Sequence, residues 1–324
     1  MVASVFIDGE SGTTGLQIRQ RLEGRRDLDI ISIDPARRKE PAARAEMLNK
    51  ADAVVLCLPD EAAKEAVGLI TNNAVKVIDA STAHRTANGW TYGFPEMEDD
   101  QRNIIADAAR VSNPGCYATG AIALIRPVVD AGLMPSDWPV TINAVSGYTG
   151  GGKSLIAAFE DPASKDHTDD NFRLYAMGIV QKHIDEIRVY GKLDHRPLFI
   201  PSVGRFAQGM LVSVPLQLWA MKGTPTIGEL HAALADHYQG ERYVEVVPLE
   251  ESLAIGVASS LDARNPEPEG LNDTNRMRLY VFGSEKHQQA VLLAQLDNLG
   301  KGASGAAVQN LNLMLGLEES AGLD

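Results

Sequence analysis

The sequence contains few of the features that mark secreted, metal-binding or membrane-spanning proteins. Only two of its 324 residues are cysteines, Cys57 and Cys116, which is too few for a disulfide framework and matches no metal-binding spacing. The longest hydrophobic runs, such as residues 53–58, are far too short to cross a bilayer. The chain also starts without the basic segment of a secretion signal. We therefore expect a soluble, cytoplasmic protein with no metal site.

Positive charge is scarce as well. The formal net charge is −13, and such a field repels nucleic acid and anionic membranes, so neither is expected as a partner. A small anionic ligand would have to be held by particular basic residues and backbone amides.

What the sequence does contain is an ordinary supply of apolar residues, 44% of the chain, in an α/β pattern. In the first hundred residues strand-like runs alternate with helical segments, which is typical of a doubly wound, Rossmann-like domain. The predicted strands cover 2–8, 29–34, 53–58 and 75–79, and the predicted helices cover 14–23, 42–49 and 59–70.

The pattern changes after residue 115. An apolar stretch at 116–131 predicts a helix that ends at Gly132. Irregularly spaced strands follow, at 140–145, 198–203, 210–218, 243–247, 277–282 and 291–296, and a last helix is predicted at 306–315. We expect an α/β protein with two domains: a Rossmann-like dinucleotide-binding domain from 1–115 plus 302–324, and an α+β catalytic and assembly domain with a large mixed sheet from 116–301.

A glycine-rich turn lies between the first strand and the first helix. It has the spacing G-x-x-G-x-x-G, not the commoner G-x-G-x-x-G. Such a turn lets a pyrophosphate approach the amides at a helix start, where the dipole favours anions. The expected cofactor contacts are Gly9, Ser11, Gly12, Thr13, Thr14 and Gly15. The alternative is a tight turn that binds nothing.

The residues after the second strand leave the choice of cofactor open. Asp34 could hold a ribose 2′-hydroxyl, which favours NAD. Arg37, Arg38 and Lys39 follow at once and could hold a 2′-phosphate, which favours NADP. A solvated basic turn is an equal alternative for these three residues.

Cys116 lies at the most informative point of the chain. It follows the turn Pro114-Gly115 and opens an apolar helix, where the dipole and free amides lower the pKa of a thiol and stabilise the thiolate. A thiolate can attack a carbonyl and form a thioester. The alternative is a small buried apolar residue, which is how we interpret Cys57.

Residues 147–154, Gly-Tyr-Thr-Gly-Gly-Gly-Lys-Ser, match the P-loop pattern G-x-x-x-x-G-K-[ST]. That pattern indicates a phosphotransferase. No downstream strand ends in a convincing Mg²⁺-directing aspartate, however, and Asp297 is a poor candidate. A loop that brings backbone close to a substrate explains the same glycines.

Together these motifs resemble N-acetyl-γ-glutamyl-phosphate reductase of arginine biosynthesis in its shorter form, over almost the whole chain. The similar segments are the turn at 9–15, the D-x-S-x-x-x-R segment at 79–85, Tyr-Gly-Phe-Pro-Glu at 92–96, Asn-Pro-Gly-Cys-Tyr at 113–117, the loop at 146–153 and the K-G-A-x-G segment at 301–310. One departure is Gln181-Lys-His183-Ile-Asp185, where the family commonly has H-R-H-x-P. His183 keeps the place of the second histidine.

The resemblance implies reduction of N-acetyl-γ-glutamyl phosphate to the semialdehyde with NADPH. It implies that Cys116 is the nucleophile and His183 the acid/base. It further implies cofactor contacts from Arg37, Arg38, Ser81, Gly147 and Asn310, and substrate contacts from Arg85, Asn113, Lys153 and Arg205. The large second sheet offers an assembly surface, so we expect a homo-oligomer, a dimer or a tetramer.

Three other functions stay open on the sequence alone. A related reductase would act on aspartyl phosphate or N-acetyl-aminoadipyl phosphate. A P-loop enzyme would bind Mg-ATP and ignore NADPH. A redox sensor would bind the cofactor and use Cys116 without catalysing the reaction.

Overall fold

A computed structural model describes residues 2–34, 36–37, 40–257 and 265–323. The chain divides into two compact units, Met1–Gly115 with Ala303–Asp324 and Cys116–Gly302. The boundary expected before Gly302 lies after it.

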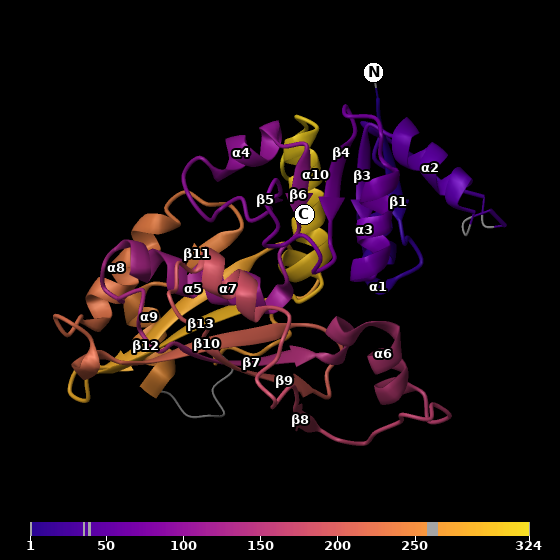
Figure 1. Ribbon diagram of the computed structural model, residues 1–324. Coiled ribbons are helices and arrows are strands. Elements are labelled where there is room, and N and C mark those ends of the chain that lie inside the picture. Colours follow the sequence, from indigo (N-terminus) through magenta and orange to yellow (C-terminus); the bar gives the residue numbers. More distant parts are fainter. Residues whose placement is uncertain (1, 35, 38–39, 258–264, 324) are drawn as a thin grey trace. The chain divides into compact units, whose positions relative to one another are not determined.

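The first unit is built on a six-stranded sheet in which every pairing is parallel (Figure 1). The strand order is β2-β1-β3-β4-β6-β5. The strands are β1 (Ala3–Asp8), β2 (Leu28–Ile31), β3 (Ala53–Leu56), β4 (Lys76–Asp79), β5 (Thr91–Tyr92) and β6 (Arg110–Ser112). The helices are α1 (Thr13–Leu22), α2 (Pro41–Lys50), α3 (Asp60–Leu69), α4 (Gln101–Asp107) and α10 (Gly305–Met314).

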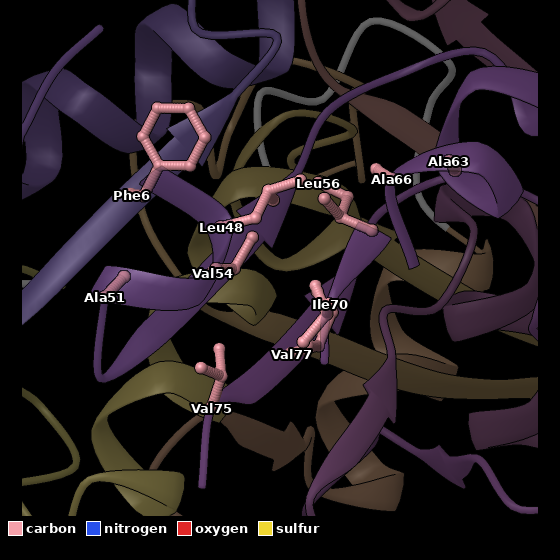
Figure 2. Packing of buried hydrophobic residues seen from close by; sticks show 10 residues of the cluster. All are labelled: Phe6, Leu48, Ala51, Val54, Leu56, Ala63, Ala66, Ile70, Val75 and Val77. Carbon is pink, nitrogen blue, oxygen red and sulfur yellow. The ribbon is translucent and has the colours of Figure 1, made fainter. Parts of the chain in front are cut away.

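The core of this unit forms around the central strand β3. All four residues of β3 are buried, as expected for a parallel strand covered on both faces. Figure 2 shows Val54 and Leu56 of this strand in one cluster with Leu48 of α2 and with Ala63 and Ala66 of α3. The negative charges of Asp60 and Glu61 in the first turn of α3 complement its helix dipole.

The second unit contains a seven-stranded mixed sheet of order β11-β12-β13-β10-β7-β9-β8. Its strands are β7 (Thr141–Gly147), β8 (Phe172–Leu174), β9 (Leu198–Gly204), β10 (Met210–Gln217), β11 (Val244–Val246), β12 (Met277–Ser284) and β13 (Gln289–Leu296). Its α-helices are α5 (Cys116–Asp130), α6 (Gly152–Glu160), α7 (Ile184–Tyr190), α8 (Ile227–His237) and α9 (Leu249–Val257). A π-helical turn at Gly300–Ser304 leads into α10.

Helix α5 packs on one face of this sheet. It is buried on nearly all sides because its sequence is apolar around the whole circumference. At Gly120 a Cβ atom would stand 2.9 Å from Cγ2 of Val212, so this glycine lets the helix approach β10 closely. The helix ends where Gly132 adopts a φ of +70° and Leu133 N–H donates to the carbonyl of Val128, a Schellman-type ending.

The predicted fold class is confirmed, and the structure corrects several details. Strand β2 ends at Ile31, so Asp34 lies in a turn and not at the end of a strand. His183 directly precedes α7, a helix whose range was not predicted. The short strands β5, β6 and β8 were not predicted. Among the described residues, no helix is both long enough and apolar enough to cross a bilayer.

Candidate active site

The predicted phosphate-binding turn is built by its glycines. Gly9 has a φ of +89°, and the Gly12 N–H donates to its carbonyl at 2.9 Å. A Cβ on Gly15 would stand 2.6 Å from the Gly9 carbonyl oxygen. Helix α1 then begins at Thr13 without a side-chain cap and without an acidic residue in its first turn. This helix start has the open, positive character that a pyrophosphate requires.

The region after β2 gives Asp34 a structural partner. Its Oδ1 accepts a hydrogen bond from the Ala36 N–H at 2.9 Å. Arg37 is exposed and pairs with Glu40 at 3.1 Å. Arg38 and Lys39 lie outside the described residues.

Ser81 is held by a buried carboxylate at the end of β4. Asp79 is fully buried, and its Oδ2 accepts hydrogen bonds from Ser81 Oγ at 2.7 Å and from His84 Nδ1 at 2.6 Å. Its Oδ1 accepts from the Ser81 N–H at 2.9 Å. Trp90 stacks on the His84 ring with centroids 4.2 Å apart. These contacts fix the backbone direction at Ser81.

Three other predicted residues meet in the same unit. Asn310 is fully buried, and its Nδ2 donates to the Gly93 carbonyl at 2.9 Å and to Asn113 Oδ1 at 3.1 Å. Asn113 Nδ2 donates to the Ala303 carbonyl at 2.9 Å. Arg85 Nε donates to the Asn113 carbonyl at 3.2 Å. The Oδ1 atom of Asn310 is buried and has no donor within the described chain, which is costly unless a ligand supplies one.

Cys116 is the first residue of α5 and is partly exposed. The first turn of the helix contains no acidic residue, so nothing there offsets the positive end of the dipole. The backbone of Gly302 lies close by, because a Cβ on Gly302 would stand 2.8 Å from the Cβ of Cys116. Any side chain at residue 302 would therefore collide with Cys116, so the packing here requires a glycine at that position.

Two tyrosines lie near Cys116. Burial, followed by the nearby Tyr175 and Cys116, raises the pKa of Tyr117 far above its usual value. Burial also raises the pKa of Tyr175 to about 12. Both hydroxyls consequently stay protonated at neutral pH. Tyr175 Oη donates to Tyr117 Oη at 3.0 Å, and Tyr117 Oη donates to the Ser202 carbonyl at 3.1 Å.

His183 lies beside the same tyrosine pair. It is only 4% exposed, and the Tyr117 ring meets its imidazole edge-on with centroids 5.4 Å apart. Gln181 Oε1 lies 2.6 Å from the His183 backbone nitrogen and 2.8 Å from its Nδ1. The second unit thus holds the predicted nucleophile and the predicted acid/base around one tyrosine, Tyr117.

In the segment that matches the P-loop pattern, three backbone amides are already engaged in hydrogen bonds to a neighbouring loop. The N–H groups of Gly147, Tyr148 and Thr149 donate to the carbonyls of Gly209, Phe206 and Ala207 at 2.9, 3.0 and 3.1 Å. A P-loop needs such amides free to surround a phosphate. Gly147 is also required for packing, since a Cβ there would stand 2.5 Å from the Ala207 carbonyl oxygen.

The two remaining basic residues differ in their surroundings. Lys153 is exposed near the start of α6. Arg205 donates to the carbonyls of Thr168 and Asp170 and lies over the Phe159 ring at 5.3 Å. These two hydrogen bonds hold the segment that precedes β8 against Arg205.

Cys57 is chemically different from Cys116. Burial, with the carboxylates of Asp79 and Asp8 nearby, raises the pKa of the Cys57 thiol to about 12. It remains a neutral thiol at physiological pH, as its interpretation as a structural residue requires.

Sequence reasoning missed three residues of this site: Tyr175, Gln181 and Gly302. Gln181 stood out only as the place where the family's first histidine is absent, and Gly302 only as part of the C-terminal motif. No sequence signal marked Tyr175. Within the described ranges, no group of His, Cys, Asp and Glu side chains could hold a metal ion.

Comparisons with known proteins identify the family to which the chain belongs. A family model described as "semialdehyde dehydrogenase, dimerisation domain" matches residues 116–298. A second, "semialdehyde dehydrogenase, NAD binding domain", matches residues 36–105.

Solved structures of similar fold include two aspartate semialdehyde dehydrogenases. Enzyme II from Vibrio cholerae has a TM-score of 0.68 and 14% identity, covering 97% of this chain and 98% of that one. The enzyme from Francisella tularensis has a TM-score of 0.70 and 14% identity, covering 97% and 100%. At this identity the likeness concerns the fold alone.

Curated relatives are far more similar in sequence. Proteins named N-acetyl-gamma-glutamyl-phosphate reductase from Brucella ovis and Brucella abortus are each 55% identical over 317 residues, 98% of this chain and 100% of theirs. The resemblance inferred from the motifs is thereby confirmed. The chain belongs to the N-acetyl-gamma-glutamyl-phosphate reductase family, within the semialdehyde dehydrogenases.

Proposed function

We propose that the protein reduces N-acetyl-γ-glutamyl phosphate with NADPH to N-acetylglutamate semialdehyde and phosphate, a step of arginine biosynthesis in the cytoplasm. The placement of Cys116 at the start of α5, with His183 buried against the ring of the adjacent Tyr117, carries the proposal. The 55% identity to reductases of this name supports the choice of substrate.

In the first half of the reaction, His183 takes the proton of the Cys116 thiol, and the sulfur attacks the acyl carbon. A C–S bond forms and the carbon–oxygen bond to phosphate breaks, which gives a thioester on Cys116. His183 passes the proton to the departing phosphate oxygen. The positive end of α5 stabilises the sulfur anion before attack.

In the second half, NADPH supplies the hydride that reduces the thioester carbon. The resulting alkoxide on Cys116 collapses, the C–S bond breaks, and the aldehyde leaves while sulfur returns to the thiolate. The backbone amide of Cys116 is our candidate donor to the developing oxyanion. The side-chain amide of Asn113, already bonded to Ala303, has less freedom for this role.

The cofactor would be held by the first unit. The uncapped start of α1 suits the pyrophosphate, and the unpartnered Oδ1 of Asn310 suits an amide donor such as a carboxamide N–H. Because Asp34 is held by the Ala36 amide, we assign the 2′-phosphate of NADP to the basic turn that includes Arg37. Arg85, Lys153 and Arg205 remain the candidates for the phosphate and carboxylate of the substrate.

The reverse reaction tests this function. Oxidation of N-acetylglutamate semialdehyde should require NADP and phosphate, and should exceed oxidation of aspartate semialdehyde or N-acetyl-aminoadipate semialdehyde. Preference for another semialdehyde would reassign the substrate, and tight binding of Mg-ATP without NADP turnover would favour a phosphotransferase.

Two variants test the chemistry. Cys116→Ser should abolish turnover, whereas Cys57→Ser, at a thiol with a pKa of about 12, should retain it. Binding of NADP with no dehydrogenase activity in the wild type would favour a redox sensor. His183→Asn should lower kcat by about 100-fold or more near neutral pH, and an unchanged pH profile would reject its acid/base role.

We further propose that the protein forms a homodimer through the sheet face opposite α5. Helix α5 contacts Val212, and the neighbouring Leu211 points to the other face of β10. There, Val145, Leu211 and Leu293 are partly exposed, and the matching family model is named a dimerisation domain. Leu211→Arg should halve the mass measured by light scattering; an unchanged mass would place the interface elsewhere.

A further inference from the structure

Gln181 lies at the point where the sequence departs from the family pattern H-R-H-x-P that it otherwise resembles. Its side chain is partly buried, two residues before His183 and ahead of α7. Its contacts indicate that it has a specific task in the second unit.

The orientation of the Gln181 amide follows from the backbone. The His183 backbone N–H can only donate, and it lies 2.6 Å from Oε1 of Gln181, so the atom facing it must be the oxygen. Nδ1 of His183 lies 2.8 Å from the same oxygen. An oxygen of this kind accepts only, so Nδ1 must carry the proton. In the neutral imidazole the lone pair is then on Nε2.

The Gln181 side chain also lies near the Tyr175 hydroxyl, whose pKa it lowers against the larger effect of burial. Tyr175 in turn donates to Tyr117 at 3.0 Å, and Tyr117 donates to the carbonyl of Ser202 on β9 at 3.1 Å. These two hydrogen bonds end on β9, at the buried residue Ser202.

We propose that Gln181 is a positioning residue, which fixes His183 in the Nδ1–H tautomer and leaves Nε2 as the atom that exchanges protons with Cys116 and the substrate. This inference rests on the proposed function of His183. A neutral amide oxygen accepts the Nδ1 proton equally in imidazole and imidazolium. Gln181 therefore keeps the ring in place in both states, as a group that takes and returns a proton requires.

The test compares Gln181→Met, which keeps the length and removes the acceptor, with Gln181→Glu, which keeps an acceptor and adds charge. Gln181→Met should lower kcat by about 10- to 100-fold, the usual cost of losing an orienting partner. KM should change by less than about threefold, since substrate contacts are retained. Nitrogen-15 NMR of His183 should show loss of the Nδ1–H tautomer in this variant only.

Gln181→Glu should keep the tautomer and move the acid limb of the kcat profile to higher pH, by about one unit, because a carboxylate favours the imidazolium. The ionisable groups next to the ring, or next to residues that contact it, are Tyr117, which meets the ring edge-on, Tyr175 and Cys116 beside Tyr117, and the buried Glu186 in the first turn of α7. All are retained in both variants. Gln217→Met, at an exposed glutamine, is the matched control and should behave as wild type.

An unchanged tautomer in Gln181→Met, or an unchanged kcat, would overturn the inference. An equal loss in Gln181→Met and Gln181→Glu without any pH shift would also overturn it, since that result indicates a purely structural role. The tautomer is measured without substrate. A failure of the proposed substrate assignment would appear in the wild-type assay and leave the NMR result standing.

Discussion

The packing around Cys116 depends on the absence of a Cβ atom at residue 302. The Gly302 backbone fits against Cys116 only because glycine has no side chain: a Cβ there would stand 2.8 Å from Cβ and 3.2 Å from Cα of Cys116. Such contacts are closer than packed carbon atoms allow. The position of the sulfur is therefore set in part by a residue with no chemistry of its own.

Gly302→Ala should for this reason displace Cys116 and lower kcat by about 100-fold, the effect of a shift of about 1 Å in a reacting group. Gly68→Ala in α3, where an added Cβ meets nothing within 4 Å, is the matched control and should leave kcat unchanged. Turnover of Gly302→Ala at the wild-type rate would show that Cys116 has room to move.

Among the elements, α5 carries an internal proline that requires compensation. Pro127 has no N–H, so the carbonyl of Ala123 one turn earlier has no intrahelical donor. The Tyr238 hydroxyl fills this place and donates to the Ala123 oxygen at 3.1 Å. The end of α8 is thereby tied to the middle of α5.

Tyr238→Phe should lower the free energy of unfolding by about 1 kcal/mol, because a buried carbonyl loses its donor. Urea denaturation measures this. Tyr148→Phe removes an exposed hydrogen bond to Glu160 and should cost less. Equal losses in the two variants would contradict the compensating role of Tyr238.

In the first unit, Asp52 ties the turn before β3 to β1. The Ser4 backbone N–H and the Ser4 hydroxyl both donate to its carboxylate at 2.7 Å. These hydrogen bonds, the backbone one first, lower the pKa of Asp52. A carboxyl whose folded pKa is lowered stabilises the fold above its unfolded pKa, and this stability is lost as pH falls through the folded value.

Asp52→Asn should therefore reduce stability at pH 7 by less than about 1 kcal/mol, since the group is largely exposed. The difference from wild type should shrink as the pH falls below about 4. Thermal unfolding across this range measures both. A difference that stays constant down to pH 2 would mean that the carboxylate charge has no part in the contact.

Elements with a strong apolar pattern were predictable from sequence, whereas the short strands β5, β6 and β8 and the helices α4, α6, α7, α8 and α9 were not. Strands β1 and β3 and helix α5 have continuous apolar or amphipathic patterns, and the structure places them within one or two residues of expectation. Strands β5, β6 and β8 have only two or three residues, too few for a period. Their pairing depends on neighbours distant in sequence.

The residues of the candidate site differ in the same respect: some leave a local pattern in the sequence and others do not. Cys116 stands out because a turn and a helix start leave a local pattern. Gln181 does not, because its role arises from contacts with Tyr175 and with the imidazole of His183, and neither contact has a sequence period. The role expected for His183 came from the family resemblance, and the structure places this residue directly before α7.

At the scale of the whole molecule, the first unit is discontinuous in sequence. Its last helix, α10, is buried along nearly its entire length and contacts α1, α4 and β4. The second unit, Cys116–Gly302, is inserted between the two parts.

A chain that ends at Gly302 should consequently lose the cooperative unfolding of the first unit and its affinity for NADPH. Its apolar surface against α10 would be exposed, whereas the second sheet keeps all its strands. Calorimetry and cofactor fluorescence would report this. A second variant, in which a flexible linker joins residues 1–115 directly to residues 303–324, should recover the cooperative unfolding of the first unit. If the truncated chain binds NADPH normally, α10 is dispensable.

The late position of α10 also governs how the protein forms during translation. When the ribosome has released residues 1–115, every strand of the first sheet exists, yet the helix that covers it is encoded almost two hundred codons later. While the inserted unit is being synthesised, the surface of the first unit that α10 later covers therefore stays exposed. Binding of the dinucleotide should therefore begin only after the residues of α10 have been made.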